Sequence, residues 1–216
     1  MRSYNQWCSL AKALDVVGER WSLLVVRELL TGPKRYTDLR DGIPGISTDV
    51  LAARLKDLED DGIVARRTLA PPAASKVYEL TELGMGLGPT VEAMARWGSQ
   101  LLGPKADGEA FRPHWIVFGL RGMLRADRAR DVVLDVDFDL GVGEAPIRVH
   151  IDDGRLEHVA EPTTVADLVV HASLLTLTGM SSGSVVIAEA RDDGRFEIEG
   201  DDEAILAFQR LFPQPR

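Results

Sequence analysis

The chain has 216 residues, of which 45% are hydrophobic and 27% are charged, a composition typical of globular proteins rather than fibrous or disordered ones. No apolar run approaches the roughly 20 residues of a membrane-spanning helix. The first residues lack the apolar core and cleavage site of a secretory signal, so we expect a cytoplasmic protein. The one cysteine, Cys8, excludes an internal disulfide framework.

The length suits one large domain or two of about 100 residues each, and the distribution of charge favours two. Residues 1–104 carry 13 Lys and Arg against 13 Asp and Glu, whereas residues 105–216 carry 12 against 21. The net charge of −9 therefore comes from the second half. A neutral first half can still present a basic face, so the total charge does not exclude a nucleic-acid partner.

The first half has the apolar periodicity of helices. Glycines mark the expected helix ends, Thr37 is the expected cap of a short third helix, and Ser47 or Thr48 caps the fourth. The four helices are expected over residues 9–18, 19–32, 36–43 and 47–62.

A hairpin and a long helix are expected next. Residues 63–69 and 76–80 have strand-forming composition around a Pro/Ala tip, which predicts a hairpin with a loose loop. The long helix covers 82–103 and is kinked at Pro89. The polar segment 103–113, which contains Gly and Pro, is the expected domain boundary.

The second half changes to a two-residue period between residues 131 and 141. Its even positions are apolar, and its aspartates lie on the opposite face, where we expect Arg148 and His150 to oppose them. Similar alternation and three helical patterns follow at residues 146–154 and 195–201, and at 114–126, 173–190 and 202–212. They predict an α+β domain over 111–216, with an antiparallel sheet and covering helices, after a mainly-α domain over 1–104.

Three helices, a helix with a polar face and an Arg-containing hairpin follow the order of a winged helix-turn-helix. The fourth helix fits a DNA major groove, and the hairpin reaches the adjacent backbone. The residues expected to contact duplex DNA are Lys34, Arg35, Arg40, Ser47, Thr48, Arg54, Lys56, Arg66, Arg67 and Lys76. For Arg54 and Lys56 the alternative is a surface ion pair, with Asp57 and Asp60 respectively.

Distinctive motifs run through the first half: a cysteine before the first helix, GERW, ELL-GP-R, GIS--VL--RL--LE-DGIV and Y-LTE-G. Over residues 7–102 the chain resembles the HxlR family of bacterial winged-helix transcriptional regulators. The resemblance implies repression, an inverted-repeat operator in double-stranded DNA, and a homodimer paired through residues 4–17 and 82–102.

Three positions depart from the family's pattern. Asp49, Ala52 and Ala53 stand where the family has polar or basic side chains. Asp49 suits the first turn of a helix because of the helix dipole, but it repels phosphates. Two alanines offer only small apolar contacts, for example to a thymine methyl group. Base recognition would then depend on few side chains.

Cys8 has two interpretations. Some family members use a cysteine at this place to sense oxidants or electrophiles, and Lys12 one turn on would lower the thiol pKa if the thiol is exposed. The alternative is a small buried hydrophobic residue at a helix start.

The second half contains DLVVHAS before LLTLTGMSSG, and then GRFEIEGDDEAILAFQRLF. In order and pattern these segments are similar to sterol-carrier-protein-like domains, over residues 111–215. Such domains enclose an apolar tunnel for lipids or other hydrophobic molecules. The resemblance implies a pocket lined by Trp115, Phe118, Met123, Phe138, Leu174, Leu177, Met180, Phe196 and Phe208, although the same residues would also fill a solid core.

No sequence motif indicates catalysis. The histidines lack metal-binding spacing, the aspartate run lacks the Gly and Glu of a calcium loop, and no phosphate loop or nucleophile elbow occurs. We expect no cofactor and no enzyme activity, since an enzyme would need a polar constellation in the second half. The predicted function is sequence-specific, DNA-binding transcriptional repression, modulated by a hydrophobic small molecule. The alternative is a lipid- or metabolite-binding protein whose winged helix serves mainly dimerisation.

Overall fold

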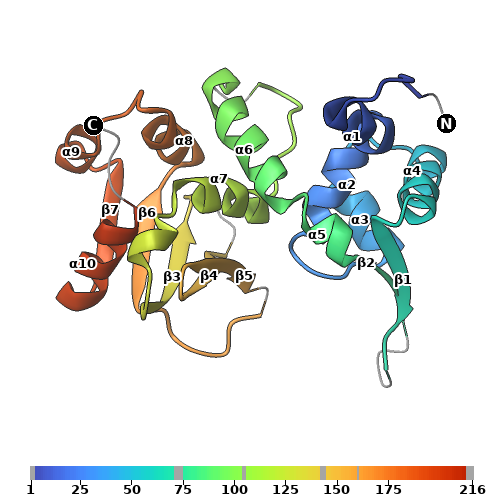
Figure 1. Cartoon of the computed structure of the whole chain (residues 1–216). Helices are drawn as coiled ribbons and strands as arrows, with labels where there is room; N and C mark the ends of the chain where they lie inside the picture. Colours follow the sequence, from blue (N-terminus) through green and yellow to red (C-terminus); the bar gives the residue numbers. More distant parts are fainter. Residues whose placement is uncertain (1–2, 71–74, 104–105, 142–144, 160, 213–216) are drawn as a thin grey trace. The chain divides into compact units, whose positions relative to one another are not determined.

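A computed structural model describes residues 3–70, 75–103, 106–141, 145–159 and 161–212. The chain divides into two compact units, Met1–Val91 and Glu92–Arg216 (Figure 1). No helix among the described residues has the length and apolarity to cross a membrane.

The first unit contains the predicted helices and the predicted hairpin (Figure 1). Its elements are α1 (Ser9–Val17), α2 (Ser22–Leu29), α3 (Tyr36–Gly42), α4 (Thr48–Asp60), β1 (Val64–Thr68), β2 (Lys76–Leu80), α5 (Glu82–Met85) and the start of α6 (Gly88–Gly98). The two strands are antiparallel, and most of the predicted hairpin tip, residues 71–74, lies outside the described residues.

Two predicted helix starts were wrong. The second helix begins at Ser22 rather than residue 19, because Trp21 has a left-handed backbone with φ of 83° and interrupts the chain there. The third helix is capped at Arg35, not Thr37, and the Arg35 backbone N–H donates to the Asp38 carboxylate at 3.0 Å. An acidic residue three positions into a helix commonly satisfies the N-cap amide in this way.

The long helix predicted over 82–103 is interrupted rather than kinked. α5 ends at Met85 and α6 begins at Gly88. Pro89 falls in the first turn of α6, where its missing N–H loses no hydrogen bond. Gly84 lies against the carbonyl of Ile63, since an added Cβ would stand 2.2 Å from that oxygen. The close approach of α5 to the start of the hairpin therefore requires glycine at this position.

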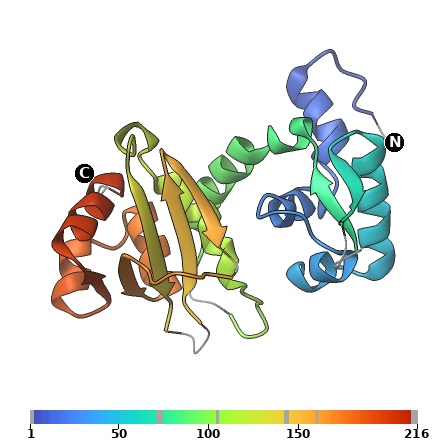
Figure 2. The same cartoon turned by 90° about the horizontal axis from the view of Figure 1, so that it is seen from below.

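The second unit holds a five-stranded sheet and several helices (Figure 2). Its elements after α6 are η1 (Ser99–Leu101), η2 (Pro113–Trp115), α7 (Ile116–Met123), η3 (Ala126–Arg128), β3 (Val133–Asp139), β4 (Ile147–Asp152), β5 (Arg155–Val159), β6 (Leu168–Ala172), α8 (Leu174–Ser182), α9 (Ile187–Asp192), β7 (Phe196–Gly200) and α10 (Asp202–Leu211). The strand order is β5-β4-β3-β6-β7.

The predicted antiparallel sheet was wrong in one pair, because β3 and β6 run parallel. β6 follows β5 in the sequence but lies on the far side of β3 in the sheet. An alternating pattern shows which residues share a face but does not show which strands become neighbours. It also did not predict β5 as a separate strand.

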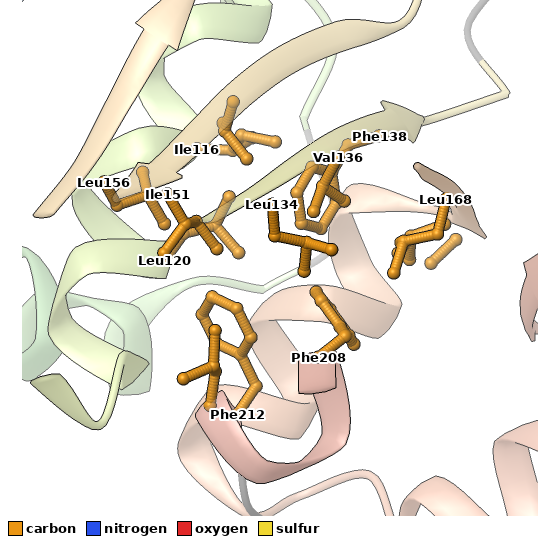
Figure 3. Close-up of a cluster of buried hydrophobic side chains, with 14 of the residues drawn as sticks. Ile116, Leu120, Leu134, Val136, Phe138, Ile151, Leu156, Leu168, Phe208 and Phe212 are labelled. Carbon is orange, nitrogen blue, oxygen red and sulfur yellow. The ribbon is translucent and has the colours of Figure 1, made fainter. Parts of the chain in front are cut away.

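The two faces of β3 differ as the alternation predicts. Leu134, Val136 and Phe138 are buried beneath the helices (Figure 3). The opposite face carries the aspartates, and both predicted pairings are confirmed: Arg148 Nε lies 2.6 Å from Asp137, and His150 Nδ1 lies 2.7 Å from Asp135. Two aspartates of this face are therefore paired with side chains of β4.

Candidate nucleic-acid interface

Helix α4 has a buried face and an exposed face. Leu51, Leu55 and Leu58 are each at most 1% exposed and fix the helix in the first unit. Of the two predicted caps, Ser47 is the N-cap, and its Oγ accepts a 3.3 Å hydrogen bond from the Val50 amide. The exposed residues of this helix and its cap, which are available to a partner, are Ser47, Thr48, Asp49, Val50, Ala52, Ala53, Lys56 and Asp60.

The residues at the start of α3 connect α4 to the hairpin. Tyr36 Oη donates a 2.7 Å hydrogen bond to the carbonyl oxygen of Thr48, the first residue of α4. Lys34 exchanges two backbone hydrogen bonds with Tyr78 of β2, at 3.0 and 2.8 Å. The start of α3, the start of α4 and the hairpin are thus held together by Lys34 and Tyr36, which lie two residues apart.

The two predicted DNA-contacting cations on α4 form the ion pairs of the alternative interpretation. Arg54 lies 2.9 Å from Asp57, and Lys56 Nζ lies 2.6 Å from Asp60. The hydrogen bond that Lys56 donates to Asp60 raises the pKa of Lys56, and the negative charge of Asp60 acts in the same direction. These side chains must exchange a carboxylate for a phosphate before they contact DNA.

The cations of the hairpin are paired in the same way. Arg66 lies 3.3 Å from Glu59 and stacks over the Tyr78 ring, with its guanidinium carbon 5.1 Å from the ring centroid. Arg67 lies 2.8 Å from Glu79 on the facing strand. In α3, Arg40 lies 3.1 Å from its neighbour Asp41. Exposed pairs of this kind are weak and exchange readily with solvent or with another anion.

Three predicted DNA-contacting cations differ from the others. Lys34, Arg35 and Lys76 have no acidic partner at ion-pair distance within the part of the chain that the structure describes. Arg35 and Lys76 are exposed and Lys34 is half-buried. Lys34 and Arg35 directly precede Tyr36, whose hydroxyl is bonded to the first residue of α4, and Lys76 begins β2. The N-terminus of a helix also favours an anion.

Comparisons with known proteins agree with this arrangement. A model of the HxlR-like helix-turn-helix matches residues 16–106. The regulator YodB of Bacillus subtilis is 37% identical over 101 residues, which are 46% of this chain and 90% of YodB. The chain belongs to the HxlR-like family. Its first unit is accordingly the DNA-binding part of a transcriptional regulator.

Other relatives also match a little less than half of this HxlR-like chain. YvaP of B. subtilis, described as an uncharacterised regulator of the same type, is 33% identical over 43% of this chain and 86% of YvaP. The solved structure of reduced YodB is 35% identical and covers 47% of this chain and all of that one, with a TM-score of 0.40.

Sequence reasoning missed two residues of the HxlR-like unit. Tyr36 had no periodic signal, because its role depends on a contact 12 residues away. Glu28 lies on the buried side of α2 with 1% exposure, 2.8 Å from Arg27. Gly42 faces it, and a Cβ there would stand 2.6 Å from Glu28 Oε2. Burial lowers the pKa of Arg27, while Glu28 opposes that shift.

Cys8 is exposed and precedes α1 as its N-cap residue. The backbone amides of Ala11 and Leu10, at the start of the helix, lower the pKa of the Cys8 thiol. Lys12 was the predicted cause of a lowered thiol pKa, but its ammonium is paired with Asp15 at 3.6 Å. A helix N-terminus, rather than a neighbouring cation, therefore favours the thiolate of this HxlR-like protein.

The second unit contains an apolar cavity of about 170 Å³ between the sheet and the helices. Six predicted pocket residues line it: Met123, Phe138, Leu177, Met180, Phe196 and Phe208. Leu120, Ile187, Ile198 and Phe212 add to the apolar lining, with Arg191 and Gln209 as the polar members.

The other three predicted pocket residues do not line the cavity. Trp115 stacks edge-on against Phe111 and His114. Phe118 is 3% exposed, with the Arg121 guanidinium over its ring. Leu174 contacts the buried core instead. Among the described residues, no group of three or more His, Cys, Asp or Glu could hold a metal ion.

Proposed function

We propose that the protein is a homodimeric repressor that binds an inverted-repeat operator with the N-terminal turn of α4 and the cations Lys34, Arg35 and Lys76. The observation that carries this proposal is the hydrogen bond from Tyr36 to Thr48. It holds the segment with two unpaired cations beside the first turn of α4. Phosphate contacts on both sides of a groove-inserted helix position that helix, and base contacts at its N-terminus then specify sequence.

The number of cations without an acidic partner predicts how strongly DNA binding depends on salt. Three unpaired cations per protomer give about six phosphate contacts per dimer, and hence a slope of log K against log salt near −5. Release of the paired Arg40, Arg54, Lys56, Arg66 and Arg67 would steepen it well beyond that value. Fluorescence anisotropy with duplex DNA from upstream of the protein's gene, over a salt series and with scrambled duplex as control, measures this slope. Equal affinity for both duplexes would contradict sequence-specific binding.

Two exposed apolar stripes support the homodimer. Trp7, Leu10 and Leu14 recur along one side at the start of the chain, at 102, 66 and 40% exposure. Met94 and Trp97 form the second stripe, with Leu101 one turn further on. Stripes of large apolar side chains that meet only water are unfavourable and mark contact surfaces. Sedimentation of the wild type and of Leu10→Glu tests this: the variant should shift from dimer to monomer.

The effector part of the proposal rests on the second unit, which we propose to be a sterol-carrier-like ligand-binding domain. The almost wholly apolar cavity supports it. A ligand would change operator affinity only if it bound the DNA-competent and DNA-incompetent states with different affinity. Anisotropy titrations with and without the ligand measure that difference.

A second candidate function is favoured by the ion pairs. With Arg54, Lys56, Arg66 and Arg67 all paired to acids, the winged helix would serve mainly dimerisation of a metabolite-binding protein. Asp49 in the first turn of α4 supports the same candidate because it repels phosphates. The salt series separates the two functions, since a dimerisation module would bind neither duplex at low salt.

A further inference from the structure

The cavity of the second unit is small for a lipid site. Its volume is about 170 Å³, whereas sites for drug-sized ligands usually measure about 300–1,000 Å³. A protein cavity of about 150 Å³ lined by aliphatic and aromatic residues holds one benzene molecule. This cavity therefore accommodates one ring with a small substituent, and neither a sterol nor a long acyl chain fits its present volume.

The interior of the cavity is apolar. Phe138 of β3, Phe196 of β7 and Phe208 of α10 are between 1 and 6% exposed and belong to its lining. Figure 3 shows Phe208 and Phe212 extending from the last helix toward the side chains of the sheet. Water inside such walls would find few hydrogen-bond partners, so the interior favours a hydrocarbon group.

The lining has one charged side chain, Arg191 near the end of α9. Arg191 is exposed, and it has no acidic partner at ion-pair distance among the residues that the structure describes. Asp193, two residues further along the chain, is paired with Arg195 at 2.6 Å. The side-chain amide of Gln209 on α10 stands in the same lining and can donate a second hydrogen bond.

We propose that this cavity binds a small apolar monoanion, a single-ring or short branched carboxylate, with its hydrocarbon part inside and its carboxylate on Arg191. The assignment rests on the proposed effector site and narrows its ligand class. An unpaired guanidinium beside an apolar cavity matches the two ends of such a molecule, since arginine binds carboxylates with paired N–H donors. A neutral hydrocarbon would leave this donor pair unused.

The test is calorimetric titration of the full chain with 4-methylbenzoate and with its neutral counterpart 4-methylbenzamide. The carboxylate should bind roughly two- to fivefold more tightly than the amide, because an exposed ion pair contributes modestly. Arg191→Met should remove this preference and leave amide binding unchanged. The matched control is Arg210→Met, which deletes the same charge from an exposed side chain outside the cavity lining and should retain the preference.

A filling variant locates the site. Leu177→Trp occupies the cavity and should abolish binding of both compounds in a protein that still unfolds cooperatively. Ile187→Phe replaces it if Leu177→Trp does not fold. Binding unaffected by filling would place the site elsewhere and overturn the proposal.

Three other results would also overturn the proposal, in distinguishable ways. Equal affinity of the two compounds for the wild type, or a preference that survives Arg191→Met, would reject the anion and keep the cavity as a binding site. Absence of binding by either compound would reject the effector class for this site. Operator binding in the anisotropy experiment is measured without ligand, so its success or failure is independent of these outcomes.

Discussion

Tyr36 and Thr48, the first residues of α3 and α4, are joined by a 2.7 Å hydrogen bond from the Tyr36 hydroxyl to the Thr48 carbonyl oxygen. The same carbonyl lies where α4 begins, so the bond fixes the helix end that is proposed to enter the groove. Lys34, two residues before Tyr36, is bonded to β2. Helix orientation and hairpin position are therefore linked through one short segment.

Tyr36→Phe deletes this hydrogen bond and keeps the ring. We expect operator affinity to fall roughly fivefold and the free energy of unfolding to fall by about 1 kcal/mol or less, since one exposed hydrogen bond is involved. Anisotropy and urea unfolding measure the two effects. Tyr78→Phe is the matched control, and an equal loss in both variants would show that the Tyr36 hydroxyl has no special role.

Releasing a paired cation should strengthen DNA binding. Asp60→Asn frees Lys56 and Glu79→Gln frees Arg67, so each variant should steepen the slope of log K against log salt by about one unit per released contact. Glu82→Gln serves as control because it removes one negative charge without releasing Lys56 or Arg67. If all three variants raised affinity equally with unchanged slope, general charge rather than released contacts would be responsible.

Cys8 should react faster than an ordinary thiol near neutral pH. Its pKa is lowered by the backbone amides of Ala11 and Leu10, so the thiolate persists to lower pH than in an unfolded chain. The rate of iodoacetamide alkylation should rise with pH at a midpoint below that of the same chain in guanidinium, where α1 is lost. Identical midpoints in the two conditions would mean that the helix terminus has no effect on the thiol.

Glu28 should be important for stability rather than for DNA contact. Its side chain is 1% exposed and lies 2.8 Å from Arg27, so Glu28→Ala leaves a largely buried guanidinium without this partner. Loss of one member of a buried pair costs about 3–5 kcal/mol. Urea unfolding should show a loss near this range, whereas the exposed Glu19→Ala should change stability little. A small loss for Glu28→Ala would mean that water or other groups replace the carboxylate.

Local sequence determined most elements of both units. The apolar period of residues 48–60 predicts α4 and its buried leucines, and alternation over residues 131–141 predicts which side of β3 is buried. These features depend on side chains within one or two turns of each other, or on alternate residues of a strand, so they are encoded in spacing. The ion pairs of Arg54 and Lys56 were open alternatives for the same reason, since both partners lie one turn away.

Only the tertiary structure decided the remaining features. Tyr36 contacts Thr48 across 12 residues, β3 pairs parallel with β6 across about 30 residues, and neither spacing carries a periodic signal. Likewise, only six of the nine predicted lining residues lie at the cavity. The sequence could not separate the two groups, because every large apolar side chain in the second half could equally fill a core. Sequence spacing fixes the face on which a residue lies, and packing between distant segments decides which faces meet and where space remains between them.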